Sequence, residues 1–240
     1  MSEQQRNNLS IAGIGTAVGG IYGNVRVDGA CRMNGALECT IFTVNGNCKV
    51  SGALAAQEAS VNGMVSVQGS VQAERLWIGG NANFKGTLDC QELQVNGRLV
   101  VDGSVHAEQI KVNGRLKAGS DIQCEHFAAE GGFDITGLLN AGRIEIIVNH
   151  RSEVSEIGGE QISVMRKGGV SLLKQLFGGK DAGLTASLIE GDDVHLEHTE
   201  ARTVRGSRVR IGPGCRIGVV EYKEELTLDP QASVGRTVQH

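Results

Sequence analysis

The side chains in this sequence with the most reactive chemistry belong to six cysteines and six histidines. Cysteines that hold zinc usually come in closely spaced pairs such as Cys-x-x-Cys, and the sequence contains no pair of this kind. His195 and His198 are three residues apart and are the candidates for a metal-binding or general-base pair. On a strand they would project to opposite sides or straddle a corner, so we interpret both as solvated surface residues.

Two glycine-containing stretches raise the question of nucleotide or acyl-group chemistry. The stretch GIGTAVG, residues 13–19, resembles a loosened dinucleotide fingerprint, but such a loop needs a strand before it and a helix after it. A polar segment precedes it and a strand-like pattern follows it, so we expect no bound cofactor. The stretch RIGPGCRIG, residues 210–218, resembles the hexapeptide repeat of left-handed β-helix acyltransferases, which use histidine as a base. We predict that the protein is not an enzyme and keep an acyltransferase as the alternative.

An internal repeat of seventeen residues must position all of these side chains. Glycine recurs at this interval without a break, at Gly29, Gly46, Gly63, Gly80, Gly97, Gly114 and Gly131. The preceding residue is mostly Asn or Asp, and Asn-Gly and Asp-Gly dipeptides tolerate the positive φ of a tight turn. We therefore interpret these glycines as the structural corners of a coiled chain.

Between the corners, apolar residues alternate with polar ones, which is the pattern of a strand with one buried face. One column of equivalent positions contains Val27, Val44, Val61, Ile78, Val95 and Val112. A third corner follows a column of small residues that includes Cys39, Cys90 and Cys124, and a residue skipped there restores the inward phase. Cysteine that alternates with alanine in one column behaves as a small buried hydrophobe. The pattern predicts an all-β fold, a parallel β-helix with 17-residue, three-faced coils.

The regularity of the repeat divides the chain into four parts. We predict a polar N-terminal tail over residues 1–20, a main β-helix over 21–165, an insert or linker over 166–184, and a shorter, less regular second β-helical segment over 185–240. In that second segment, Asp193, Arg208 and Glu225 hold equivalent places, which predicts alternating charges and salt bridges between neighbouring coils.

Composition argues against nucleic acid as a partner, because a net charge of −4 gives no general attraction to a polyanion. No apolar run approaches the roughly 18–20 residues that span a bilayer, and the N-terminal residues lack the apolar core of a signal peptide. We therefore expect a cytoplasmic protein. The insert contains Leu172, Leu173, Leu176 and Phe177, which either cover an open side of the β-helix or make a peripheral membrane contact. We favour the first of these two interpretations.

The ends of a β-helix expose unpaired backbone donors and acceptors, and such edges template the addition of another chain unless they are capped. We therefore expect chains to stack end to end into filaments that need no cofactor. The expected polymer contacts are Val25, Val27 and Met33 on the first coil, with Leu226, Leu228 and Val234 on the last.

The glycine-cornered repeat, as in VRVDGACRMNGAL and LVVDGSVHAEQIKVNGRL, resembles that of the bactofilins, a family of polymer-forming bacterial cytoskeletal proteins. The resemblance covers residues 21 to about 147. It implies a right-handed β-helix and nucleotide-independent filaments, often at the membrane, which position other proteins in cell shape, envelope growth or motility. The implied partners are further copies of this chain, a paralogous bactofilin and recruited proteins that the resemblance does not identify. As an alternative, the second segment and the insert would make the chain a capping regulator of a paralogue's polymer.

Overall fold

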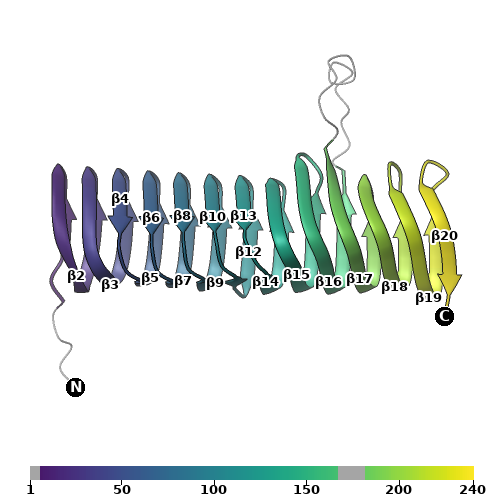
Figure 1. Cartoon of the computed structure of the whole chain (residues 1–240), viewed down its shortest axis with the longest axis horizontal. Helices are drawn as coiled ribbons and strands as arrows, with labels where there is room; N and C mark the ends of the chain where they lie inside the picture. Colours follow the sequence, from purple (N-terminus) through teal and green to yellow (C-terminus); the bar gives the residue numbers. More distant parts are fainter. Residues whose placement is uncertain (1–5, 167–181) are drawn as a thin grey trace, which may run out of the picture. The chain divides into compact units, whose positions relative to one another are not determined.

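The structure is a computed structural model that describes residues 6–166 and 182–240. The chain forms two compact units, residues 1–120 and residues 121–240. Within each unit, strands of successive coils pair in parallel (Figure 1), and the described residues include no helix. The predicted all-β parallel β-helix is therefore confirmed. Its right-handed sense stays a prediction.

The described residues of the first unit form thirteen strands, β1 to β13. They are β1 (Leu9–Ile11), β2 (Ile14–Val27), β3 (Ala30–Val44), β4 (Asn47–Val50), β5 (Leu54–Val61), β6 (Met64–Val67), β7 (Val71–Ile78), β8 (Asn81–Phe84), β9 (Leu88–Val95), β10 (Arg98–Val101), β11 (Val105–His106), β12 (Gln109–Val112) and β13 (Arg115–Ala118).

A typical coil of the first unit is an eight-residue strand followed by a four-residue strand, as in β5 and β6. The register steps by seventeen residues, so Ala59 lies beside Leu76. The third corner that the sequence predicts lies inside the long strand, where Gln57 is skipped in the pairing. The buried side of the strand changes there, from Leu54 before the skip to Ala59 after it. A skipped residue thus turns the chain without ending the strand.

Three faces run through the first unit, and each is a stack of equivalent segments. The first face consists of residues 30–34, 47–51, 64–68, 81–85, 98–102 and 115–119. The second face consists of residues 37–40, 54–57, 71–74, 88–91 and 105–108. The third face consists of residues 41–44, 58–61, 75–78, 92–95 and 109–112.

Stacks of like side chains fill the interior of the first unit. Val27, Val44 and Val61 lie in register and are at most 1% exposed. Each fully buried aliphatic side chain of this size contributes roughly 1.5–3 kcal/mol of hydrophobic stabilisation. The repeated column therefore provides the hydrophobic stabilisation that the few aromatic residues cannot provide. Cys31 lies beside Cys48 on the next coil, and both are buried. Both cysteines therefore belong to the core of the first unit.

Glycine is needed at the corners because the next coil approaches closely. A Cβ atom on Gly63 would collide with the backbone carbonyl oxygen of Gly46, and one on Gly80 would collide with that of Gly63. The positive φ that the Asn-Gly pattern predicts is wrong for these corners. Among the described glycines, a positive φ occurs at Gly20, Gly35 and Gly214. Glycine is therefore required at the corners by close backbone approach. Gly131 lies in the second unit, between the strands β14 (Ile122–Ala129) and β15 (Gly132–Ile147).

The residues before the corner glycines form a ladder of side-chain hydrogen bonds. Asn45 donates its side-chain amide to Asp28 at 2.6 Å, and Asn62 donates to Asn45 at 2.9 Å. Further along, Asn113 donates to Asn96 at 2.8 Å. The position between these two runs is Gly79, which interrupts the ladder because it has no side chain.

The second unit is built from longer strands that pass through the corners. They are β14 (Ile122–Ala129), β15 (Gly132–Ile147), β16 (Arg151–Met165), β17 (Gly183–Leu196), β18 (Thr199–Ile211), β19 (Arg216–Leu228) and β20 (Ser233–Gln239). The predicted insert, residues 166–184, falls almost wholly between β16 and β17, and its residues 167–181 lie outside the described part of the chain.

Charged residues of the second unit alternate between neighbouring coils. Asp193, Arg208 and Glu225 lie in register, as the sequence predicts. Arg208 pairs with Asp193 at 2.5 and 2.7 Å, but on its other side it pairs with Glu224 at 3.0 Å. The pairing shifts register between Gly206 and Arg208, and a shift of this kind is invisible in the spacing of the sequence.

Candidate functional site

The segment predicted as a polar tail, residues 1–20, contributes strands to the first unit. β1 pairs with residues 25–27, and the first part of β2 pairs with β3. The offset there is sixteen residues, since Leu9 lies beside Val25 and Ala17 beside Met33. A search for a period of seventeen misses these strands for this reason. The predicted tail is therefore corrected: its described part belongs to the β-helix from Leu9 onward.

This extra coil changes the status of three predicted polymer contacts. Val25, Val27 and Met33 are at most 1% exposed and point into the core. Val25 and Val27 of β2 lie between β1 and β3, and Met33 of β3 lies between β2 and β4. The three residues are core side chains in the described structure. Because none of them lies on the surface of this unit, their predicted role at an exposed end is wrong.

Three other apolar side chains lie exposed on β2. The exposed fraction is 95% for Ile14, 73% for Val18 and 61% for Ile21. The only described strands that pair with β2 are β1, at residues 25–27, and β3. Residues 14–22 of β2 therefore present both an open backbone edge and apolar side chains, which we call the β2 edge. The seventeen-residue repeat does not reveal this edge, because the coil that forms it pairs with the next coil at an offset of sixteen residues.

The predicted contacts of the second unit lie on β19 and β20. Leu226 and Leu228 continue the inward columns of Val209 and Ile211, and Leu228 is nevertheless 44% exposed. β20 pairs with residues 216–222, and within the described residues no strand covers residues 225–228 on that side. Val234 lies on β20 beside Ile217 and is half-buried. We call residues 225–228 the β19 edge.

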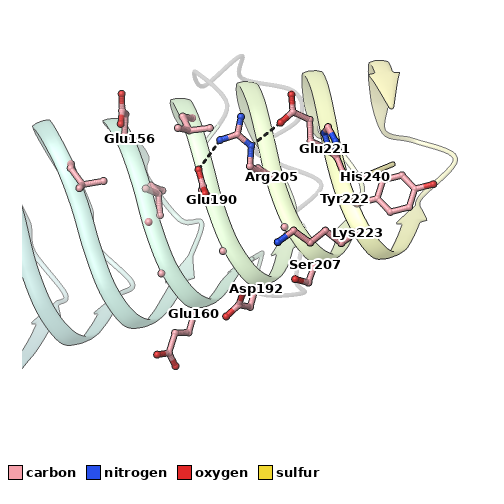
Figure 2. A pocket seen from close by; sticks show the side chains of 17 residues that line it. Glu156, Glu160, Glu190, Asp192, Arg205, Ser207, Glu221, Tyr222, Lys223 and His240 are labelled. Carbon is pink, nitrogen blue, oxygen red and sulfur yellow. Dashed lines mark hydrogen bonds and ion pairs between the residues drawn. The ribbon is translucent and has the colours of Figure 1, made fainter. Parts of the chain in front are cut away.

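A surface groove of about 420 Å³ runs over β16 to β19 in the second unit (Figure 2). Its lining includes Gly159, Gly191 and Gly206, which lie in register on successive coils. A Cβ atom on Gly191 would lie 2.6 Å from the carbonyl oxygen of Gly159, and one on Gly206 would lie 2.7 Å from that of Gly191. The glycines are thus explained by the close approach of the coils, and the groove is their consequence. Tyr222 follows them in the same column.

Arg205 crosses this groove and ties three strands together (Figure 2). Its guanidinium donates to Glu190 at 3.0 Å and to Glu221 at 2.7 Å. The hydrogen bond from Arg205 lowers the pKa of Glu221. Arg205 and these two glutamates therefore form a charge network across the groove.

The candidate histidines are separated by the end of a strand. His195 lies in β17 between Ser163 and Arg210 of the neighbouring coils. His198 follows the end of β17 and has a φ of 47°. The described residues include no group of three or more His, Cys, Asp or Glu side chains that could hold a metal ion. The glycine-rich stretch at residues 13–19 lies mostly within β2, which β3 follows, so the helix of a dinucleotide site does not follow it.

The cysteines are poorly suited to nucleophilic chemistry. Burial raises the pKa of Cys39 to about 11 and those of Cys48 and Cys124 to about 12. The thiolate is the reactive form, and at neutral pH these groups are overwhelmingly thiols. None of the six cysteines forms a disulfide.

The predicted membrane or capping contact falls on residues that the structure does not describe. Leu172, Leu173, Leu176 and Phe177 lie between residues 167 and 181. Over the described residues, no helix is both long enough and apolar enough to cross a membrane.

Comparisons with known proteins agree on part of the chain. Residues 66–140 match the family model of the bactofilins, which is described as polymer-forming cytoskeletal. Two Bacillus subtilis proteins that are themselves named as uncharacterized, YhbF and YhbE, are each 46% identical to this chain, over 99 and 102 residues. The matches cover 41% and 42% of this chain and span 40% and 42% of the lengths of these relatives. No solved structure matches. Residues 66–140, in the regular part of the seventeen-residue repeat, are thus similar to the bactofilin family, whose model carries the description polymer-forming cytoskeletal.

Proposed function

We propose that this protein is a non-enzymatic cytoskeletal scaffold whose chains assemble end to end into filaments without a nucleotide, and that the filaments position other proteins in the cytoplasm. The match of residues 66–140 to the bactofilin family model, described as polymer-forming cytoskeletal, supports this proposal. Roles in cell shape, envelope growth or motility, a paralogous partner and a peripheral membrane contact follow from the family resemblance and belong to this proposal.

The observation that carries the end-to-end contact is the β2 edge. An open strand edge offers a row of unpaired backbone donors and acceptors to another chain, and Ile14, Val18 and Ile21 add exposed apolar side chains. On the β19 edge, Leu226 and Leu228 continue inward columns that no described strand covers on that side. On the β2 edge, Val18 and Ile21 lie beside the exposed Asn34 and Glu38 of β3, so these apolar side chains flank the open backbone on the outer surface. On the β19 edge, a further coil would complete the burial of inward columns.

The test images the purified protein by negative-stain electron microscopy over a concentration series without nucleotide. We expect filaments from the wild type. The double variant Val18→Glu/Ile21→Glu should lose them, since charged side chains on an edge strand oppose the addition of another strand. The matched control is Ile41→Glu/Trp77→Glu, which changes two residues that are 37% and 53% exposed on the third face.

Circular dichroism distinguishes loss of assembly from loss of folding. Filaments from the β2-edge variant would contradict this contact, while a control that behaves like the wild type supports it. Discrete particles from the wild type at every concentration would overturn self-assembly and favour a capping role on a paralogue's polymer.

A further inference from the structure

The first face of the first unit carries an excess of positive charge. Its exposed cationic residues are Arg32, Lys49, Lys85, Arg98, Arg115 and Lys117. Its one acidic residue is Asp102, which pairs with Lys85 at 2.8 Å. The chain as a whole has a net charge of −4, so this face departs in sign from the rest of the protein.

Four of the six cations of the first face have no partner among the described residues. The side chains of Arg32, Lys49, Arg98 and Arg115 make no hydrogen bond or ion pair with the described residues. Arg98 and Arg115 lie in register on adjacent coils, an arrangement of like charges that destabilises a sheet. In the second unit, by contrast, Arg216 pairs with Glu200 of the neighbouring strand at 3.1 Å.

The second face of the first unit has the opposite charge. Its acidic residues are Glu38, Glu74, Asp89 and Glu108. A groove of about 490 Å³ lies on this face, and its lining includes the small residues Cys39, Ala56, Ala73 and Cys90. Arg6 pairs with Glu38 at 3.0 Å at one end of the groove, and His106 lies 3.3 Å from Asp89.

We propose that the basic first face of one copy docks on the acidic second face of another copy, so that the polymers associate side by side. The inference rests on the proposed filament function. Both faces repeat at the same strand spacing of about 4.8 Å, so one row of charges can match the other over several coils. Long lysine and arginine side chains reach into a groove whose floor is made of small residues.

A second copy fits the first face better than an anionic polymer or a lipid surface does. The net charge of −4 opposes the long-range approach of any polyanion. An acidic face of matching repeat, by contrast, is present on every copy of the protein. Association through exposed charges should weaken steeply with salt, because the Debye length falls from about 8 Å at physiological ionic strength to about 3 Å at 1 M.

Complementary charge reversal tests the proposal. Variant A is Lys49→Glu/Arg98→Glu/Arg115→Glu, and variant B is Glu74→Lys/Glu108→Lys. The matched control for variant A is Arg202→Glu/Arg210→Glu/Lys223→Glu, which reverses three exposed cations of the second unit whose side chains form no ion pair with the described residues. Bundling is measured by low-speed pelleting and electron microscopy, and the fold by circular dichroism.

We expect wild-type filaments to bundle at low salt and to separate at about 1 M salt. Variants A and B should each form single filaments that do not bundle, and an equal mixture of the two should regain bundling. The control should bundle as the wild type does. Bundling that survives in variants A and B, or fails to return in the mixture, would overturn the proposal.

Failure of the filament proposal gives a different result. If the wild type forms no filaments, sedimentation velocity of the A and B mixture should still show a heterologous complex that neither variant forms alone, and its absence would overturn the pairing of the faces. A third outcome is that the wild type pellets with vesicles containing anionic lipid, that variant A does not, and that no bundles form. This outcome would assign the basic face to a membrane instead.

Discussion

The side-chain carbonyl oxygen of Asn62 lies 3.3 Å from where a Cβ atom of Gly79 would stand, so the corner ladder ends at a residue that cannot continue it. Gly79 has no positive φ, and equivalent corners carry Asn or Asp. The backbone conformation therefore accepts a side chain at this position, and the Asn62 amide must move by a few tenths of an ångström to make room for it.

Replacing Gly79 with Asn should join the two halves of the ladder. The added hydrogen bonds and the lower entropy of the unfolded chain should together raise the free energy of unfolding by roughly 1 kcal/mol. Urea denaturation measures the change. Gly79→Ala is the control and should gain about 0.5 kcal/mol, the entropic part alone. An Asn variant no more stable than the Ala variant would contradict the hydrogen-bonded ladder.

The neighbouring glycine should respond in the opposite direction. Gly80→Ala places a Cβ atom against the carbonyl oxygen of Gly63, and forcing the coils apart should lower the free energy of unfolding by about 1–3 kcal/mol. Gly79→Ala, one residue away, is the matched control in the same urea experiment. Equal stabilities of the two alanine variants would show that close approach does not explain the corner glycines.

The pair between Asp193 and Arg208 should make stability depend on pH in a defined direction. Arg208 donates a hydrogen bond to the Asp193 carboxylate and thereby lowers the pKa of Asp193 in the folded state. A lowered folded pKa stabilises the protein above the unfolded pKa of about 3.9, and this contribution disappears as the pH falls through the lower, folded value.

The measurement compares unfolding free energies of the wild type and Asp193→Asn from pH 7 to pH 2. The difference should be constant above about pH 5, shrink below the unfolded pKa of about 3.9, and decrease with added salt. Asp192→Asn is the control and should show a smaller difference throughout. A difference between the wild type and Asp193→Asn that grows as the pH falls would have the wrong sign for this pair.

The buried thiols should be nearly inert in the folded protein. With a pKa of about 12 for Cys48 and Cys124, almost no thiolate is present at pH 8, and burial blocks access as well. Labelling with an aromatic disulfide reagent at pH 8 should be slow in buffer and rapid in urea. Equal labelling rates of Cys48 under both conditions would show that this column is not a closed core.

The fold could be predicted from the sequence because identical side chains recur at one interval. Val27, Val44 and Val61 lie in one column, and the interval alone places them in register. The reason for the corner glycines could not be predicted, since an Asn-Gly pair is compatible with both a positive φ and close backbone approach. The backbone φ of the corner glycines and the short distance from Gly63 to the neighbouring carbonyl oxygen separate the two explanations.

The exposed edge was harder to predict than the core. Val25 and Met33 look like the first coil until Leu9 and Ala17 are paired with them at an offset of sixteen. The charge on the first face was hidden for another reason. Net charge averages over the chain, whereas the arrangement of Lys49 beside its equivalents is seen only when the sequence is set out in columns of seventeen.

The strand pairing skips Gln57, and on both sides of this residue the register steps by seventeen residues. One coil is therefore a repeating block of fixed length. Removing residues 52–68 would join Ser51 to Gly69 and bring Leu37 beside Val71, a contact of the same chemistry as the one between Leu37 and Leu54 that it replaces. Duplication or loss of one such block during evolution would lengthen or shorten a unit in increments of about 4.8 Å. The length of a unit would thus change by whole coils, and the contacts between neighbouring coils would keep the same chemistry.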